Sequence, residues 1–321
     1  MRPIAAITVG LFMLLPATAA ADGLPAVGID ATPLSAPGGD VAYVTKAGKH
    51  ATHVVERARY GGVLRQRRIE GVFSLPAVAY DGSPAGISAD GRTLVLISPR
   101  TRYPRRRTTF AVLDTKRLTV RRQIGLKGDF SFDAIAPNGG LMYLVKYDPR
   151  AYGEYEVRAY DLRAQRLLAE PIVDPREPDE EMYGVPVTRA SSADGRWAYT
   201  LYDKPHHPFV HALDTSGRTA VCIDLDGVRN GWGATLELRG PTLEVVGGAG
   251  RVLASIDTQT HRLIETAAPL AKAGGKEAGA AEDGGSAWLR VALPAAAALL
   301  LLLLIVRIRR RSVSAAEVRG L

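Results

Sequence analysis

Hydrophobic positions along this chain alternate with polar ones in short runs that follow Asp-Gly or Asn-Gly pairs. Three segments align closely: SADGRTLVLIS (88–98), APNGGLMYLVK (136–146) and SADGRWAYTLY (192–202). APGGDVAYVTK (36–46) and LRGPTLEVVGG (238–248) are weaker copies. Such runs are typical of β-hairpins, and we expect type I′ turns because Asn-Gly and Asp-Gly tolerate positive φ. The pattern predicts an all-β fold.

A further strand pattern completes each repeat. In each copy except the one at 36–46, the strand that follows ends at or near an Asp: FAVLDT (110–115), VRAYDL (157–162), VHALDT (210–215) and VLASIDT (252–258). A tight turn and another strand follow. The turn glycines at 39, 91, 139, 195 and 240 are separated by 45 to 56 residues. Repeats of four strands at about this period are typical of propeller blades. We therefore predict a β-propeller of about five four-stranded blades over residues 22–268.

The phrase FAVLDTKRLTVRRQIGLKGDFSFDAIAPNGGLMYLV resembles the YVTN-type repeat, a bacterial relative of WD-repeat propellers. VAYVTKAG (41–48) resembles the motif that names this family. The resemblance covers about residues 36–267 and is clear in three of the five copies, although the Trp-Asp dipeptide is absent. It implies a propeller fold and little about chemistry, because such propellers serve many functions. An unrelated β-sandwich is the alternative.

The N-terminal end carries an export signal. Residues 1–21 begin with a positive Arg2, continue as an uncharged apolar stretch and end in small residues that include Ala17-Thr18-Ala19. This order is typical of a cleavable signal peptide. A permanent N-terminal anchor is the alternative, but a membrane-spanning helix needs about 20 apolar residues.

The C-terminal end carries a membrane anchor. Residues 288–308 are almost entirely apolar and, at 1.5 Å per residue, form a helix of about 31 Å, enough to span a bilayer. The basic tail 309–321 follows, and cations beside a span mark the cytoplasmic side. Residues 269–287 are rich in Gly and Ala and predict a flexible stalk. We expect a single-pass membrane protein with its propeller outside the cytoplasm.

Charge and cysteine content narrow the partners. The chain has a net charge of +8, to which Arg2, Arg307 and the four arginines of the C-terminal tail contribute. A basic excess of this origin reports membrane topology, so we expect no nucleic-acid partner. Cys222 is the single cysteine, which excludes a disulfide within the chain. We expect its thiol to be a small buried apolar group.

Blade geometry sorts the loops onto two faces. Asp-Gly turns and Asp-terminated strands fall on one face, where their carboxylates serve as turn caps. Longer loops fall on the other face, and long loops on a rigid scaffold are where binding usually resides. The candidate ligand-binding residues on these loops are Arg100, Arg102, Tyr103, Arg105, Arg106, Arg107, Tyr152, Tyr155, Tyr183, His206, His207 and Trp232.

The arginines of PRTRYPRRRT form the densest charge cluster outside the tail. Residues 98–122 contain nine cations and one acid, Asp114. Such a loop suits an anionic envelope polymer or an acidic protein, while the tyrosines offer flat amphipathic surfaces. The alternatives are a merely solvated loop and a loop that pairs with the acidic segment DPREPDEE.

The sequence gives little support for a metal or cofactor site. His206, His207 and His211 lie close together, but Pro205 and Pro208 prevent the helix that would bring 207 and 211 onto one face. We expect neither a metal nor another cofactor. No catalytic motif is present in the sequence, so enzyme activity is left open.

The function expected from these features is a membrane-anchored binding, scaffold or sensing module for an envelope polymer or protein. The alternative is a propeller hydrolase or lyase with its site in the central funnel. Exposed edges of the first and last blades also favour self-association.

Overall fold

The computed structural model describes residues 32–148, 150–151, 154–204 and 207–266. Their regular elements are strands, apart from one short 3₁₀ turn, η1 (Gly248–Gly250). The all-β prediction is therefore confirmed. None of the described residues belongs to a helix long and apolar enough to cross a membrane. The predicted signal peptide (1–21), stalk (269–287), transmembrane helix (288–308) and tail (309–321) lie outside the described residues.

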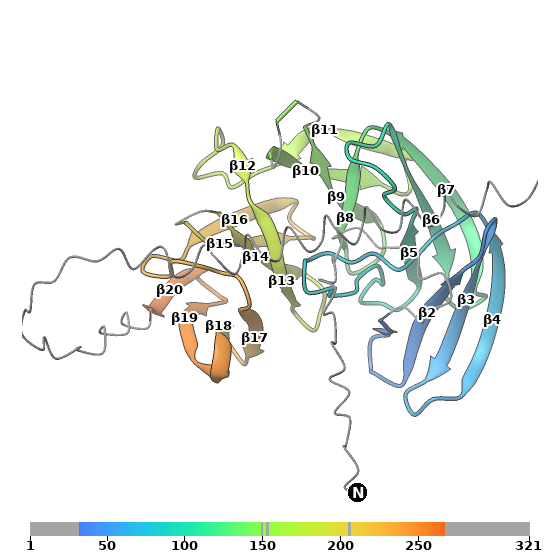
Figure 1. Ribbon diagram of the computed structural model, residues 1–321, viewed down its shortest axis with the longest axis horizontal. Helices are drawn as coiled ribbons and strands as arrows, with labels where there is room; N and C mark the ends of the chain where they lie inside the picture. Colours follow the sequence, from blue (N-terminus) through green and yellow to red (C-terminus); the bar gives the residue numbers. More distant parts are fainter. Residues whose placement is uncertain (1–31, 149, 152–153, 205–206, 267–321) are drawn as a thin grey trace, which may run out of the picture. The chain divides into compact units, whose positions relative to one another are not determined.

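The strands form five antiparallel sheets, which succeed one another in chain order (Figure 1). Sheet 1 contains β1 (Leu34–Ser35), β2 (Val41–Ala47), β3 (Ala51–Ala58) and β4 (Val63–Glu70). Sheet 2 contains β5 (Thr93–Ile97), β6 (Arg107–Asp114) and β7 (Thr119–Lys127). Sheet 3 contains β8 (Phe130–Ile135), β9 (Leu141–Tyr147), β10 (Glu154–Asp161), β11 (Arg166–Ile172) and the short β12 (Met182–Tyr183), which pairs with β10.

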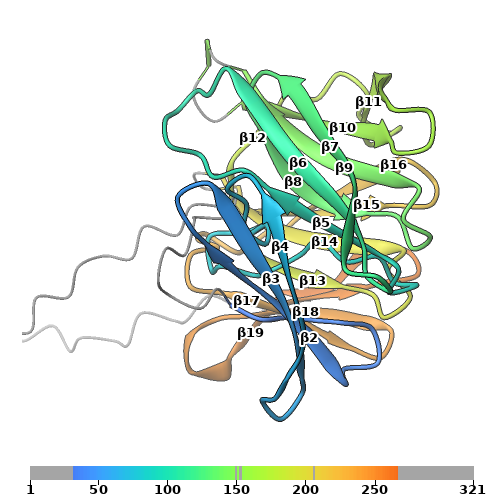
Figure 2. The same ribbon diagram turned by 90° about the vertical axis from the view of Figure 1, so that its right-hand side faces the viewer.

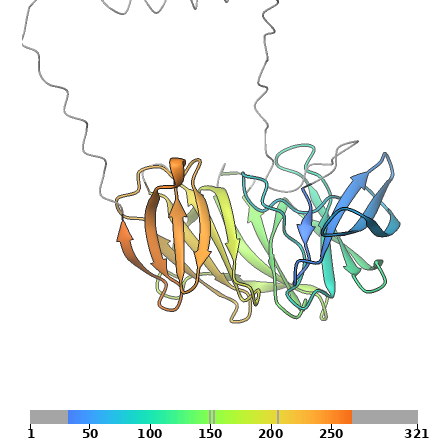
Figure 3. The same ribbon diagram turned by 90° about the horizontal axis from the view of Figure 1, so that it is seen from below.

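Sheet 4 contains β13 (Val185–Ser191), β14 (Trp197–Asp203), β15 (Phe209–Asp214) and β16 (Thr219–Asp224). Sheet 5 contains β17 (Thr235–Arg239), β18 (Thr242–Val246), β19 (Val252–Asp257) and β20 (Arg262–Thr266). Figure 3 shows the strands of sheets 4 and 5 running up and down with their connections at the two ends. Consecutive four-stranded meanders of this kind are the building units of a β-propeller.

The tight turns differ from the predicted type I′ geometry. Gly91, Gly139 and Gly195 have φ of 68°, 69° and 71°, whereas the Asp or Asn before each of them is not among the residues with positive φ. The Gly91 N–H donates to the Ser88 carbonyl over 2.8 Å. This is a type I turn followed by a left-handed glycine, within a four-residue connection between Ser88 and Thr93, where the Ser88 N–H donates to the Thr93 carbonyl over 3.0 Å. The type I′ prediction was wrong because the carboxylate of Asp90 caps the turn by accepting from the Arg92 N–H over 3.0 Å.

The aspartates that end the third strands are turn caps, as predicted. Asp114 Oδ1 accepts from the Arg117 N–H over 2.9 Å, and Asp214 Oδ1 accepts from the Gly217 N–H over 2.8 Å. The threonine after each of these two aspartates ties the neighbouring turn, because Thr115 and Thr215 donate to the carbonyls of the turn glycines. The Leu-Asp-Thr motif thus joins two turns at the same end of a sheet.

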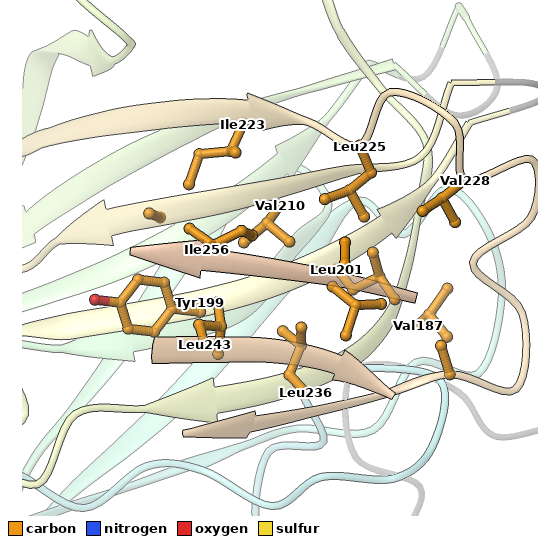
Figure 4. Packing of buried hydrophobic residues seen from close by; sticks show 14 residues of the cluster. Val187, Tyr199, Leu201, Val210, Ile223, Leu225, Val228, Leu236, Leu243 and Ile256 are labelled. Carbon is orange, nitrogen blue, oxygen red and sulfur yellow. The ribbon is translucent and has the colours of Figure 1, made fainter. Parts of the chain in front are cut away.

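Successive sheets pack through four buried clusters. Leu96 and Ile69 belong to the cluster between sheets 1 and 2, and Phe132 and Ile97 to that between sheets 2 and 3. The remaining two clusters join sheets 3 and 4 and sheets 4 and 5. In the last of these, Leu201 of sheet 4 lies among the side chains of sheet 5 (Figure 4). Across the described residues, no comparable cluster joins sheet 5 to sheet 1.

Sheet 2 lacks a regular inner strand, and residues 74–87 take its place. Ser74 exchanges backbone hydrogen bonds of 3.0 Å with Ile97, and the Val95 N–H donates to the Gly86 carbonyl over 2.7 Å. Between these contacts the chain leaves the sheet as a hairpin, here called the inner hairpin (residues 76–85). Its Tyr80 N–H donates to the Pro186 carbonyl of β13 over 2.8 Å. The inner hairpin thus connects sheet 2 directly to sheet 4.

Candidate functional site

The strand directions define two faces. The loop face holds the connections 98–106, 173–184 and 225–234, and the turn face holds the tight turns 88–92, 136–140 and 192–196. The candidate residues predicted from the sequence that are described all belong to loop-face segments or to the strand ends beside them. The structure separates these residues into paired, buried and exposed groups.

Arg100 and Arg105 are held by one buried carboxylate. The side chain of Asp129 is 1% exposed, and its Oδ1 accepts from Arg100 Nη2 over 2.9 Å. Arg105 Nε lies 3.2 Å from the same oxygen, and the Arg105 N–H donates to Asp129 Oδ2 over 3.0 Å. The Arg105 guanidinium also donates to the Ser98 carbonyl over 2.8 Å. These contacts fasten the arginine loop to the start of sheet 3, rather than to the acidic segment DPREPDEE.

Arg100 is further enclosed by two aromatic rings. Its guanidinium carbon lies 4.8 Å from the ring centroid of Tyr147 and 5.7 Å from that of Tyr103. Cation–π contacts of this kind favour a desolvated guanidinium. Arg100 and Arg105 therefore have a structural role, because their donors are directed at groups of the same chain, and their ligand-binding role stays a prediction.

The other arginines of this loop reach solvent. Arg102, Arg106 and Arg107 are exposed, and so is 40% of Tyr103. The Arg107 guanidinium lies flat against Gly125 of β7, where a Cβ atom would stand 2.0 Å from Nη2. Gly125 therefore makes room for a side chain that stretches across the outer strand.

The aromatic residues predicted to form a surface differ in their exposure. Tyr155 is only 7% exposed and stacks on Tyr202 with ring centroids 5.1 Å apart, so the prediction of an exposed Tyr155 was wrong. Its place in β10 turns the ring into the interface between sheets 3 and 4. Tyr183 is exposed, as is Trp232, which packs edge-on against Tyr80 of the inner hairpin at 4.9 Å.

The histidine segment supplies one exposed imidazole. His207 is exposed, and its backbone N–H donates to the Lys204 carbonyl over 2.9 Å. Tyr152 and His206 lie outside the described residues. Within the described part of the chain, no group of three or more His, Cys, Asp or Glu side chains is placed to hold a metal ion.

Unpaired cations gather on the outer strands of sheets 1 and 2, on the side that Figure 2 turns toward the viewer. β4 and β7 are neighbours there, linked by Gln123 Nε2, which donates to the Glu70 carbonyl over 3.0 Å. Seven cations of this region form no ion pair with any described residue, and we call them the basic margin. They lie on β4 (Arg67), on β7 (Arg122 and Lys127), in the turn before β7 (Lys116 and Arg117) and at the start of β6 (Arg106 and Arg107).

A polar row crosses the otherwise apolar interface between sheets 3 and 4. Strand register aligns Arg189, Thr200, His211 and Cys222 from the inner to the outer strand of sheet 4. Arg189 Nη1 donates to the Asp133 carbonyl of β8 over 3.0 Å, and Nη2 pairs with Asp133 Oδ1. Both side chains are more than nine-tenths buried. This pair was not predicted, although a charge within each of the apolar inner strands FSFDAI and VPVTRAS was a signal for it.

Cys222 is less buried than predicted. Its side chain is half-buried at the outer end of the row, and its N–H donates to Asp174 Oδ2 over 2.9 Å. Burial and the nearby Glu180 and Asp174 carboxylates raise the pKa of its thiol well above the ordinary value. The thiol is therefore protonated at neutral pH, which disfavours a nucleophilic role.

Comparisons with known proteins find solved structures that resemble this chain only at low TM-scores. No protein-family model matches this chain, and no curated protein matches it either. The β-propeller domain of Myceliophteria thermophila Cps50 (Swd1) superposes with a TM-score of 0.45 at 14% identity, over 71% of this chain and 65% of that chain. The chain thus spans slightly less than two thirds of that structure.

Two further structures have similar scores. The Dos1 propeller gives a TM-score of 0.45 at 8% identity, over 75% of this chain and 59% of that chain. An acylaminoacyl peptidase in complex with a chloromethyl ketone gives 0.43 at 13% identity, over 70% of this chain and 35% of that chain. The propeller assignment rests on the five packed meanders themselves.

Replacing Asp129 with Asn should destabilise the protein strongly. The change leaves the buried Arg100 and Arg105 guanidiniums without their carboxylate, and breaking a buried pair in this way costs about 3–5 kcal/mol. Urea unfolding followed by fluorescence measures the loss. Asp148→Asn is the control, because its partner Arg150 is exposed, and its midpoint should stay close to that of the wild type. Equal midpoints for both variants would contradict the structural role of Asp129.

Stability should fall as the pH drops from about 6.5 to about 4. Burial lowers the pKa of His211 to about 4, against the opposing effect of Asp133, so the folded state keeps the imidazole neutral. The unfolded chain takes up a proton below its ordinary pKa of about 6.5, which favours unfolding over this range. Urea unfolding at several pH values should show a shallower slope for His211→Gln. An unchanged slope would contradict a buried neutral His211.

Proposed function

We propose that this protein is a membrane-anchored extracytoplasmic propeller that binds an anionic envelope polymer through the basic margin. The observation that carries the proposal is the set of seven cations without an ion pair on and beside the adjacent outer strands β4 and β7. We further propose that the five sheets are blades of a YVTN-type propeller. The turn–strand–Asp repeat supports this, and so does the match of each repeat to one sheet.

The basic margin suits an extended polyanion. At about 3.4 Å per residue, the nine residues of β7 span about 30 Å, from Arg117 beside one end to Lys127 at the other. Arg guanidiniums pair with phosphate and carboxylate oxygens in a fork geometry. Cations that are already paired, such as Arg65 with Glu56 and Arg121 with Asp114, lie between the unpaired ones and keep the strands in place.

Arginines at the edge of the loop face extend the basic margin along the path of the polymer. Arg106 and Arg107 stand where β6 begins, and the register places Arg107 opposite Lys127 at the end of β7. The exposed Tyr103 belongs to the same loop. A polymer that follows β7 would therefore reach the remaining free arginines of the loop predicted from the sequence.

Neutralising four cations of the basic margin should weaken polyanion binding by roughly tenfold or more, since each exposed pair contributes about 0.2–1 kcal/mol. The variant combines R67Q, R106Q, R117Q and K127Q, and the probe is immobilised inorganic polyphosphate. Binding of the wild type should also fall as salt rises from about 50 to about 200 mM, because exposed charges are screened.

The matched control removes four exposed arginines elsewhere. R166Q, R218Q, R229Q and R262Q remove the same net charge from exposed residues that also form no ion pair with described residues. This variant should retain most of the affinity. Equal losses in the two variants would mean that net charge alone attracts the polymer and would overturn the proposal.

The proposed membrane topology has its own test. A reporter enzyme that is active only outside the cytoplasm, fused after Thr266, should be active in cells, and the same reporter fused after Leu321 should be inactive. The reason is that the basic residues of 309–321 favour retention of the tail in the cytoplasm. Activity of the C-terminal fusion would contradict the proposed anchor.

A further inference from the structure

A cavity of about 310 Å³ lies between the inner strands of sheets 1 to 4. Its walls come from β1, from residues 84–87 beside β5, from β8 and from β13 with the turn after it. At about 30 Å³ per water, the volume corresponds to roughly ten water molecules. We call it the axial cavity. It contains none of the residues of the basic margin.

The axial cavity has one covered end and one open end. The inner hairpin bonds to Pro186 and Val187 at the start of β13 and so covers the loop-face end. The cavity is lined by the far end of β13 and the following turn, which places its mouth on the turn face. There Gly195, with φ of 71°, comes so close to Ala89 of sheet 2 that a Cβ atom would stand 2.7 Å from the Ala89 Cβ. The turns of sheets 2 and 4 therefore touch beside the mouth.

The buried Asp133–Arg189 pair forms the polar part of the wall. Arg189 directs one N–H of Nη1 and one of Nη2 at Asp133. Asp133 Oδ2 and Arg189 Nε have no hydrogen-bond partner, but both atoms are closed off from solvent, so the two remaining Nη N–H groups are the donors left for a ligand. The pair carries no net charge. It therefore favours an uncharged ligand with hydrogen-bond acceptors.

The rest of the wall is mixed in character. Phe132, Ile135 and Ile87 offer apolar surface, whereas Ser191 offers a hydroxyl near the mouth. Ligand pockets of about 300 Å³ and more commonly combine apolar walls with a few convergent polar groups. Hydroxyl groups on a compact carbon ring match this combination, because each hydroxyl is both donor and acceptor while the ring faces are apolar.

We propose that the axial cavity binds a neutral polyhydroxylated molecule of the size of one sugar ring. The mouth on the turn face admits it, and the Asp133–Arg189 pair receives its hydroxyls. This site is separate from the basic margin and independent of polymer binding there. A free anion would meet the carboxylate of Asp133, and a free cation would meet the guanidinium of Arg189, so both are disfavoured relative to a neutral ligand.

The test is calorimetric titration of the full chain, purified in a detergent without sugar headgroups. The probes are methyl glucoside, N-acetylglucosamine and myo-inositol, with glucuronate and glucosamine as charged counterparts. At least one neutral probe should bind saturably and more tightly than either charged one. If none of the neutral probes binds, the cavity holds water only and the proposal fails. Tighter binding of a charged probe would also overturn it.

Two variants locate the binding. Ala193→Trp places a bulky side chain at the mouth and should weaken binding about tenfold or more, while Ser216→Trp, on the turn face outside the cavity, should not. The double variant Asp133→Asn/Arg189→Gln removes both charges and shortens the Arg189 side chain, and it should weaken binding to a similar extent. Thermal midpoints check that each variant is folded. Wild-type affinity in both the Ala193→Trp and the double variant would place the ligand elsewhere and overturn the proposal.

Discussion

Burial of sheet faces is the constraint on which the structure depends. Sheets 2, 3 and 4 have apolar side chains on both faces, and each face is covered by the next sheet in the chain. Leu201, for example, packs toward sheet 5, while its neighbour Tyr202 packs toward sheet 3 (Figure 4). The series can end at sheet 5 because its other face is polar. There the register aligns Glu237, Glu244, Ser255 and Glu265.

The same packing makes the centre crowded. Inner strands of different sheets approach so closely that the turn of sheet 4 meets the turn of sheet 2 at Gly195 and Ala89. Sheet 2 contributes an irregular inner segment, whose hairpin satisfies backbone groups of β13. A charge in such a place requires a partner, because an isolated buried ion is strongly destabilising. Asp133 and Arg189 therefore occur together, 56 residues apart in the chain.

The repeat pattern predicted the strands well because turn residues and alternating side chains are local signals. Each Asp-Gly or Asn-Gly segment is followed by the expected strand, and each Leu-Asp-Thr motif caps the expected turn. The turn type was missed, since the choice between type I and type I′ depends on how the Asp90 carboxylate caps the turn by accepting from the Arg92 N–H. A dipeptide signal does not contain that information.

The site could be predicted less well because it depends on contacts between distant residues. From the sequence, Arg100 and Arg105 could not be distinguished from the other arginines of the loop. In the structure these two pair with the buried Asp129. Tyr155 was expected in a loop, but it belongs to β10 and its side chain is buried. The basic residues of β4 were visible in VLRQRRIE, but only the pairing of sheets 1 and 2 brings them beside those of β7.

Edge protection is a second possible reason for charges on outer strands, since charged side chains discourage strands from pairing with other chains. Side chains of either charge give this protection, and the other outer strands carry both charges. β11 carries Arg166 and Glu170, and β20 carries Arg262 and Glu265. The basic margin consists of cations alone, and the nearby acids Glu56, Glu70 and Asp114 are already paired. Like charges kept close together repel one another, and this repulsion is the argument for the proposed polyanionic partner.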